Sequence, residues 1–244
     1  MKKLSRIRAL IFCLVLPVFL FSAYRIYQYW DEGHISQQFT ETLVNQAVYN
    51  PTSAEDIPIT VDFDSLQRKY ADVVAWLYCE DTPINYPIAQ ADDNTYYLRR
   101  LLDGTENQSG TLFMDSRNQA EFSDWNTVIY GHNMKNGTMF GTLPDYCNQA
   151  YYDAYPILYL FTPQQTYCVE LIAGYVTAST SEAYSIPQSQ EERDRLLDDA
   201  RERSTFVSSA TIEPDNRVIT LSTCSYEYDD ARYVLIGVLH TFNT

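Results

Sequence analysis

The pattern of hydrophobic and polar positions in this 244-residue chain begins with an uncharged stretch, residues 9–24, bounded by Arg8 and Arg25. As a helix it would be roughly 24 Å long at ~1.5 Å per residue, short of the ~30 Å hydrocarbon core of a membrane. Flanking arginines can snorkel, and the aromatic residues up to position 30 suit a membrane interface, so they supply the missing length. The pattern therefore predicts one membrane-spanning helix over residues 9–30.

Charges on the two sides of this stretch predict its orientation. Basic residues precede it and two acidic ones, Asp31 and Glu32, follow it, which puts residues 1–8 in the cytoplasm as a short tail and the rest of the chain outside. A cleaved signal peptide is the alternative. Cleavage after Ala23 would put bulky Phe21 at the third position before the cut, where a small residue is required, so the sequence favours an uncleaved anchor.

Residues 31–60 combine a helical pattern with a linker. Apolar residues recur at helical spacing outside the span, namely Ile35, Phe39, Leu43, Ala47 and Val48. The segment 49–59 contains two prolines and several turn formers, which indicates a linker. A second helix is predicted after it, with Asp64 as N-cap, Gln67 in a capping-box position and an apolar face that extends to Leu77.

From residue 61 onward, short β-type runs between turn residues dominate, which predicts one domain over residues 61–244. The clearest runs are Thr127–Tyr130, Ile157–Phe161, Tyr167–Ala178, Val218–Thr223 and Tyr233–His240. A helix interrupts them, because Ser189 and Glu192 form a capping box and two arginines, up to Arg203, suit its C-terminal end. The predicted fold class is α+β: mainly β, as a barrel or sandwich, with peripheral helices.

Composition and charge narrow the range of functions. With 45% hydrophobic residues the chain can form a core, whereas its formal net charge of −15 excludes a nucleic-acid-binding protein, since phosphate binding needs clustered Lys and Arg. The five cysteines are an odd number, so at least one thiol is expected to be unpaired. A free thiol in an oxidising compartment indicates a functional cysteine.

Cys224 is the thiol whose position favours such a role. In the run Val218–Cys224 residues alternate between two faces, and the apolar Ile219 and Leu221 mark the side that points to the core. Cys224 then ends the strand on the opposite face, which it shares with the hydroxyl of Ser222. A face that carries hydroxyls is an unusual place for a purely structural thiol.

Arg232 and His132 complete the candidate chemistry. Arg232 opens the next strand after a short connection, so a hairpin would put it beside Cys224, where a guanidinium can stabilise a thiolate and an oxyanion. Of the three histidines, His34 is expected to lie in a juxtamembrane tether and His240 to pack in the last strand. His132 follows a strand and precedes a turn, which makes it the candidate proton shuttle.

Three separated motifs resemble the signature of the sortase family: TLSTC, ending at Cys224; the arginine of ARYVLIG, Arg232; and YGHNM, around His132. The resemblance covers roughly residues 62–240. The helices before the barrel and the helix inserted before the cysteine strand resemble class B sortases. This resemblance implies a closed sortase-type β-barrel with two N-terminal helices and one helix inserted before the cysteine strand.

Sortases are cysteine transpeptidases of the Gram-positive cell surface. The resemblance implies that Cys224 attacks a C-terminal sorting motif of a surface protein, that Arg232 holds the oxyanion and that His132 protonates the leaving amine. An amine of a peptidoglycan precursor, or a pilin lysine in a pilus-polymerising member, then releases the product from the thioacyl enzyme. Neither a cofactor nor a metal ion is expected, and contact with membrane lipid is expected through residues 9–30.

Substrate contacts are inferred from the same resemblance at Asn85, Tyr130, Tyr184 and Ser222. Ser225 departs from the pattern, because some class B members carry an acidic residue directly after the cysteine. Two other interpretations are weighed against this one. A papain-like enzyme is disfavoured because its cysteine opens a helix and precedes the histidine. A non-enzymatic surface-binding module would leave the placement of the cysteine, histidine and arginine unexplained.

Overall fold

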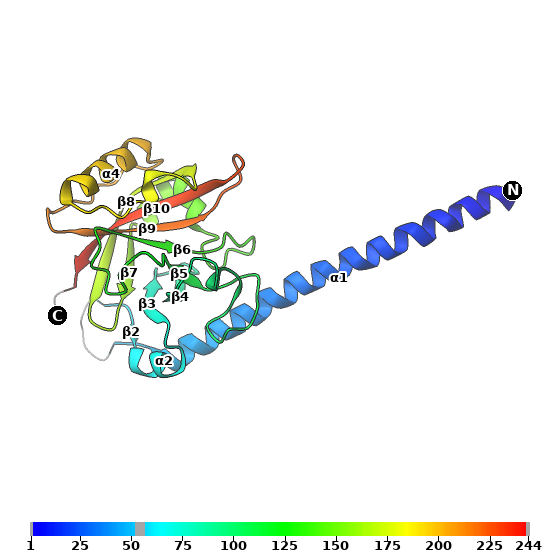
Figure 1. Cartoon of the computed structure of the whole chain (residues 1–244), viewed down its shortest axis with the longest axis horizontal. Helices are drawn as coiled ribbons and strands as arrows, with labels where there is room; N and C mark the ends of the chain where they lie inside the picture. Colours follow the sequence, from blue (N-terminus) through cyan, green and yellow to red (C-terminus); the bar gives the residue numbers. More distant parts are fainter. Residues whose placement is uncertain (1, 52–56, 243–244) are drawn as a thin grey trace.

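The computed structural model describes residues 2–51 and 57–242, with side chains from residue 12 onward, and consists of a globular body from which one long helix projects (Figure 1). That helix is α1 (Lys2–Ala47). The other helices are α2 (Phe63–Lys69), α3 (Gln149–Ala154) and α4 (Gln190–Arg203), with 3-10 turns η1 (Tyr97–Arg99), η2 (Leu143–Cys147) and η3 (Glu182–Tyr184).

The body is a closed barrel of eight strands in the order β10-β8-β7-β3-β4-β5-β6-β9. The strands are β3 (Val73–Tyr78), β4 (Asn85–Ala89), β5 (Leu112–Met114), β6 (Asn126–Tyr130), β7 (Ile157–Phe161), β8 (Thr166–Ala178), β9 (Arg217–Cys224) and β10 (Ala231–Thr241). Alternate residues of all eight contribute to one buried cluster, for example Leu77, Leu171 and Leu221. The predicted fold class, mainly β with peripheral helices and a closed barrel, is confirmed.

Helix α4 forms where the sequence predicts a helix before the cysteine strand. Ser189 is its N-cap and accepts a hydrogen bond from the backbone N–H of Glu192 at 3.3 Å. Its apolar edge, Leu196, Leu197 and Ala200, lies closest to β8. It belongs to one buried cluster with outward-facing residues of three strands, Ile172 of β8, Val218 of β9 and Val234 of β10. The helix therefore covers the outside of the strands that carry the candidate cysteine and arginine (Figure 1).

The second predicted helix is shorter than the sequence indicates. Its N-cap is Asp62, not Asp64, because the Asp62 carboxylate accepts the N–H of Ser65 at 2.9 Å. The helix ends at Lys69, and the apolar residues assigned to its last turns, up to Leu77, form β3 instead. The β-branched and aromatic sequence of β3 pairs with β4 and β7 inside the barrel, and this tertiary pairing outweighs a helical spacing that the same residues also fit.

Helix α1 joins two segments that the sequence treats separately. It continues without a break from the apolar stretch through Gly33 to Ala47, so the predicted boundary between residues 30 and 31 is not a structural break. Beyond Gly33 the helix packs on the body through Leu43 and Ala47. A mid-helix glycine costs only ~1 kcal/mol relative to alanine, which this packing offsets. The predicted linker, residues 49–59, connects the two strands of a small sheet, β1 (Val48–Tyr49) and β2 (Thr60–Val61). Its residues 52–56 lie outside the described residues.

Residues 12–30 of α1 are exposed almost throughout, and the helix is long and apolar enough to cross a membrane. This property is compatible with the predicted single anchor.

Candidate active site

The hairpin of β9 and β10 brings Cys224 and Arg232 together. The two are direct cross-strand partners, and the register continues inward through Leu221 opposite Leu235. Where the hairpin leaves the barrel, the backbone N–H of Ser225 donates to the carbonyl of Ala231 at 2.9 Å, so the pairing extends past the cysteine. The predicted hairpin and its placement of Arg232 beside Cys224 are confirmed.

His132 reaches the same edge of the barrel because β6 runs parallel to β9, so the ends of both strands meet there. Three hydrogen bonds tie the two ends together. The N–H of Gly131 donates to the Ser222 carbonyl at 3.1 Å, and the Thr223 hydroxyl donates to the Gly131 carbonyl at 2.8 Å. The Asn133 side chain donates to the Cys224 carbonyl at 2.8 Å. The residues on both sides of His132 are thus fixed to the cysteine strand.

The imidazole of His132 is oriented by a backbone carbonyl. Its Nε2 lies 2.7 Å from the carbonyl oxygen of Leu98, the middle residue of η1. A carbonyl oxygen can only accept, so Nε2 carries a proton in this contact. In the neutral ring, Nδ1 is then the nitrogen with a free lone pair, which is the group that can take or return a proton.

Arg232 is held by a carboxylate from its own hairpin. Its Nη2 lies 3.0 Å from Asp230, and its Nη1 donates to the carbonyl of Ala231 at 3.0 Å. Asp230 also accepts a hydrogen bond from the Ser179 hydroxyl, and this bond followed by the charge of Arg232 lowers the pKa of Asp230. The guanidinium is therefore anchored on one side, while its remaining N–H groups are free of contacts within the described part of the chain.

One cavity of about 680 Å³ contains all three candidate catalytic residues, Cys224, His132 and Arg232. It is also lined by three of the four predicted substrate-binding residues, Tyr130, Tyr184 and Ser222. We call it the substrate cavity.

Asn85 lies outside this cavity. It stands at the start of β4, where its side-chain oxygen accepts a hydrogen bond from the Trp76 indole at 2.7 Å. The geometry therefore gives its predicted role in substrate binding no support.

The wall of the substrate cavity is a connected set of polar groups, of which Asp115, Tyr184 and Ser222 are buried. The Tyr130 hydroxyl donates to Asp115 at 2.8 Å, and its ring stacks on Tyr184 with centroids 6.1 Å apart. The Tyr184 hydroxyl lies 2.8 Å from the Ser222 hydroxyl. The Arg117 guanidinium donates two hydrogen bonds to Asp115 and a third to the Tyr184 carbonyl. Every polar tip in this wall has a partner, so the wall is rigid.

The charge state of the wall follows from these contacts. Burial by itself would raise the pKa of Asp115, but hydrogen bonds from Arg117 and Tyr130 outweigh it and lower that pKa to about 2. Burial, together with the bond to Asp115, raises the pKa of Tyr130, and burial raises that of Tyr184. Both phenols stay neutral near pH 7, while the carboxylate is charged and paired.

Several residues of the site are absent from the sequence prediction. Asp115 directly follows the apolar run of β5. A position at the end of a strand is also what identifies His132 as a candidate, so the same sequence signal could have identified Asp115. Leu98 contributes only its backbone carbonyl, which no side-chain pattern can indicate. Asn133 and Asp230 act through contacts with residues distant in sequence or across a turn.

All five cysteines are free, and the part of the chain that the structure describes holds no cluster of His, Cys, Asp or Glu suited to a metal ion.

Comparison with known proteins agrees with this geometry. The sortase domain family matches residues 77–240. Sortase B of Listeria monocytogenes is 36% identical over 236 residues, which cover 93% of this chain and 94% of that protein. The crystal structure of sortase B from Bacillus anthracis in complex with AAEK1 has a TM-score of 0.75 at 29% identity and covers 87% of this chain and 100% of its own. A Staphylococcus aureus sortase B-substrate complex has a TM-score of 0.70 at 27% identity, with 74% and 85% coverage.

The matched family spans nearly all of the barrel, and the relative from Listeria extends the match over almost the whole chain. The chain therefore belongs to the sortase family and is a class B sortase, a cysteine transpeptidase.

Proposed function

We propose that this sortase is anchored in the cell membrane by α1 and joins surface proteins that carry a C-terminal sorting motif to an amine of the cell-wall precursor. The observation that carries the proposal is the presence of Cys224, His132 and Arg232 in one cavity, each with its own positioning contact. Membership of an enzyme family sets aside a non-enzymatic binding module. We further propose residues 1–8 as a cytoplasmic tail, 9–30 as the span, 31–60 as an outer helix with a linker, and 61–244 as the catalytic domain.

In the first half-reaction, the Cys224 sulfur attacks as a thiolate, its proton held by His132, at the carbonyl carbon of the scissile bond in the sorting motif. A carbon–sulfur bond forms and the carbonyl oxygen becomes an oxyanion, which the free N–H groups of Arg232 stabilise. When the intermediate collapses, the carbon–nitrogen bond breaks and His132 gives its proton to the departing amine. The product is a thioester between the substrate and Cys224.

In the second half-reaction, an amine attacks the thioester carbonyl. His132, now neutral, takes a proton from that amine, and the carbon–sulfur bond breaks to return the Cys224 thiolate. The acceptor is an amine of a peptidoglycan precursor. A lysine of another pilin subunit would pass through the same steps in a pilus-polymerising enzyme. If water attacks, the same thioester is hydrolysed.

We assign substrate binding to the wall formed by Tyr130, Tyr184 and Ser222. Its support is the fixed geometry of two stacked, neutral tyrosines and a hydroxyl on the face of the cysteine strand. A relative from Staphylococcus aureus, whose fold this chain shares, has been solved as a sortase B-substrate complex, which supports substrate binding by this fold.

The test is a transpeptidation assay with the purified full chain, a panel of sorting-motif peptides and an amine acceptor. We expect an amine-dependent product that Cys224→Ala abolishes. The matched control is Cys147→Ala, which removes an exposed thiol outside the cavity and should leave the product unchanged. Full product formation by the Cys224 variant would overturn the assignment. Cleavage without amine dependence would identify a hydrolase instead.

A further inference from the structure

A second cavity, of about 420 Å³, also reaches His132. We call it the juxtamembrane cavity, because its lining combines residues of the membrane helix and of the body: Tyr29, Arg99, Gln108, His132, Lys135 and Tyr226. Apart from His132, none of these residues lines the substrate cavity. The histidine is therefore a shared wall between two separate spaces, and the second one has no role in the reaction described above.

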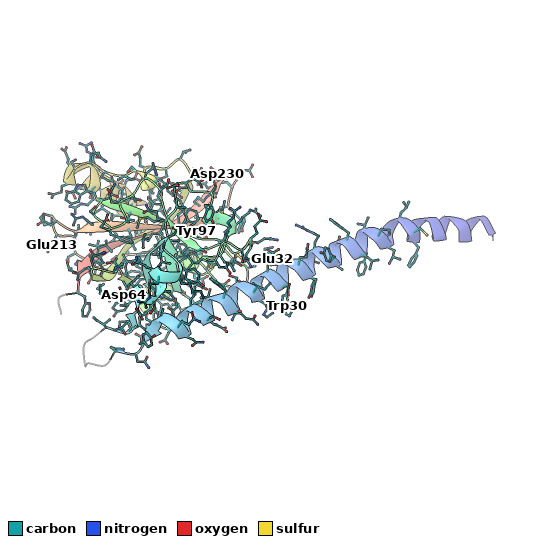
Figure 2. All side chains as sticks on the ribbon, turned by 60° about the horizontal axis from the view of Figure 1, so that its bottom comes forward. Trp30, Glu32, Asp64, Tyr97, Glu213 and Asp230 are labelled. Atoms are coloured by element: carbon teal, nitrogen blue, oxygen red, sulfur yellow. The ribbon has the colours of Figure 1, made fainter. Side chains whose placement is uncertain are left out.

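The position of α1 beside this cavity is fixed by specific contacts. The Glu32 carbonyl accepts a hydrogen bond from the Asn107 side chain at 2.8 Å, and the Glu32 carboxylate accepts the N–H of Gln108 at 3.0 Å. A Cβ added at Gly33 would lie 4.0 Å from the side chain of Asn136, so the loop that follows His132 lies against the helix. Figure 2 shows Trp30 and Glu32 at the end of the body from which the helix projects. The membrane helix and the catalytic loop thus form one wall.

This wall begins where the exposed apolar surface of α1 ends. The last large side chains of that surface include Tyr27, Tyr29 and Trp30, all exposed except where Tyr29 borders the cavity. Tyrosine and tryptophan prefer the headgroup region of a membrane. If α1 crosses the membrane as proposed above, the juxtamembrane cavity opens at the level of the lipid headgroups.

The charge of the lining is opposite to that of the protein. The chain has a formal net charge of −15, yet the lining contains two basic residues, Arg99 and Lys135, and no Asp or Glu. Neither of the two forms an ion pair within residues 12–51 and 57–242, whereas the neighbouring Arg100 is paired with Glu106. Two unpaired cations at a membrane surface attract a phosphate.

We propose that the juxtamembrane cavity binds the phosphate of a membrane-lipid headgroup, with Arg99 and Lys135 as its charged contacts and Tyr29 at its membrane side. The proposal rests on the membrane anchoring in the proposed function. A headgroup bound there lies against His132, on a path separate from the sorting peptide. The catalytic histidine then works at the membrane surface, where an acceptor amine carried by a lipid can reach it.

The test uses the full chain in nonionic detergent, with Cys224→Ala so that the result does not depend on transpeptidase activity. Dihexanoyl phosphatidylglycerol is titrated while the unfolding temperature is measured. Saturating binding at a hundredfold excess over Kd should raise that temperature by about 5–10 °C for a chain of this size. Dihexanoylglycerol, which lacks the phosphate, should give no such shift, and inorganic phosphate at the same concentration should give a much smaller one.

Two double variants make the test specific. Arg99→Gln with Lys135→Gln should raise the half-saturating lipid concentration by about thirtyfold, at ~1 kcal/mol per basic contact. The control, Arg68→Gln with Lys69→Gln, removes the same two residue types from α2, near the far end of the docked helix, and should bind like the parent.

Equal lipid binding by the parent and the Arg99/Lys135 variant would overturn the proposal, as would equal weakening in the control. A shift with inorganic phosphate as large as with the lipid would also contradict it, because the site would then recognise free phosphate. If the chain with Cys224 intact gives no product in the transpeptidation assay while Cys224→Ala still binds the lipid, only the proposed transpeptidase reaction is overturned.

Discussion

The hydroxyl of Thr223 offers a direct test of how the fold positions His132, the proposed catalytic histidine. This side chain is 2% exposed, and its hydroxyl donates at 2.8 Å to the carbonyl of Gly131, the residue before His132. Thr223→Val keeps the shape and the β-branched preference of the strand but removes the donor. The His132 loop then loses one of its three ties to the cysteine strand.

Two consequences follow in different measurements. The lost bond, and the carbonyl left without its partner, should lower the free energy of unfolding by about 1–2 kcal/mol. A displacement of the histidine by ~1 Å can cost up to about a hundredfold in rate. We therefore expect kcat to fall by about ten- to a hundredfold with little change in KM, because Thr223→Val leaves the tyrosine wall in place.

The assay is transpeptidation at several concentrations of a sorting peptide, together with urea unfolding of the same preparations. Thr220→Val is the matched control, since it removes an equally buried hydroxyl from the same strand, one that donates to Asn126 at 2.9 Å. Asn126 holds the carbonyls of Ala183 and Ser185 beside the tyrosine wall, so this control should affect KM more than kcat. An unchanged kcat in Thr223→Val, with stability reduced as expected, would refute the positioning argument.

Three other changes give distinct outcomes. Arg232→Ala should reduce turnover in the transpeptidation assay by about 10²–10³, the usual effect of losing one oxyanion donor. Arg217→Ala, at the other end of β9, should leave turnover intact, and equal losses in the two variants would contradict the oxyanion role. The pKa of Asp115 in the folded protein is about 2, below its ordinary 3.8. The ionised carboxylate therefore stabilises the fold by about 2 kcal/mol above about pH 4, and this contribution is lost as the pH falls toward 2. The stability difference between parent and Asp115→Asn in urea should therefore shrink over that range, and a constant difference would count against the assignment. Leu221→Ala, in the fully buried barrel interior, should cost about 2–5 kcal/mol of unfolding free energy by calorimetry or urea, and a loss below 1 kcal/mol would contradict its place in the core.

His132 borders both the substrate cavity and the juxtamembrane cavity. On one side it lies with the thiol and guanidinium, and on another it borders a space that is lined in part by Tyr29 of α1. Figure 2 shows Asp230, which holds Arg232, at the same end of the body as Glu32 of α1. The candidate site and α1 therefore share one end of the molecule, which is the arrangement that the proposed membrane anchor and membrane-borne acceptor would use.

The sequence by itself determined the features that depend on short spans of chain. Alternation within β9 and a short connection set Cys224 opposite Arg232, because side-chain period and hairpin length are local properties. The capping residues before α4 located that helix for the same reason. His132 could be selected from the sequence because it stands at the end of a strand. Its position in space relative to Cys224 could not be predicted, because the two lie on strands far apart in the chain.

Only the tertiary structure decided the features that depend on partners far away in the chain. Whether residues 73–78 form a helix or a strand depended on the edges that β4 and β7 offer, since both periods fit the same apolar residues. Asn85 lies outside the substrate cavity, with its side chain bonded to Trp76 on the neighbouring strand β3. The contact of Leu98 with His132 is made by the Leu98 backbone, so no side-chain pattern predicts it. The continuity of α1 depends on the packing of its far end on the body. Such contacts are set by the packing of the whole chain, which no local pattern contains.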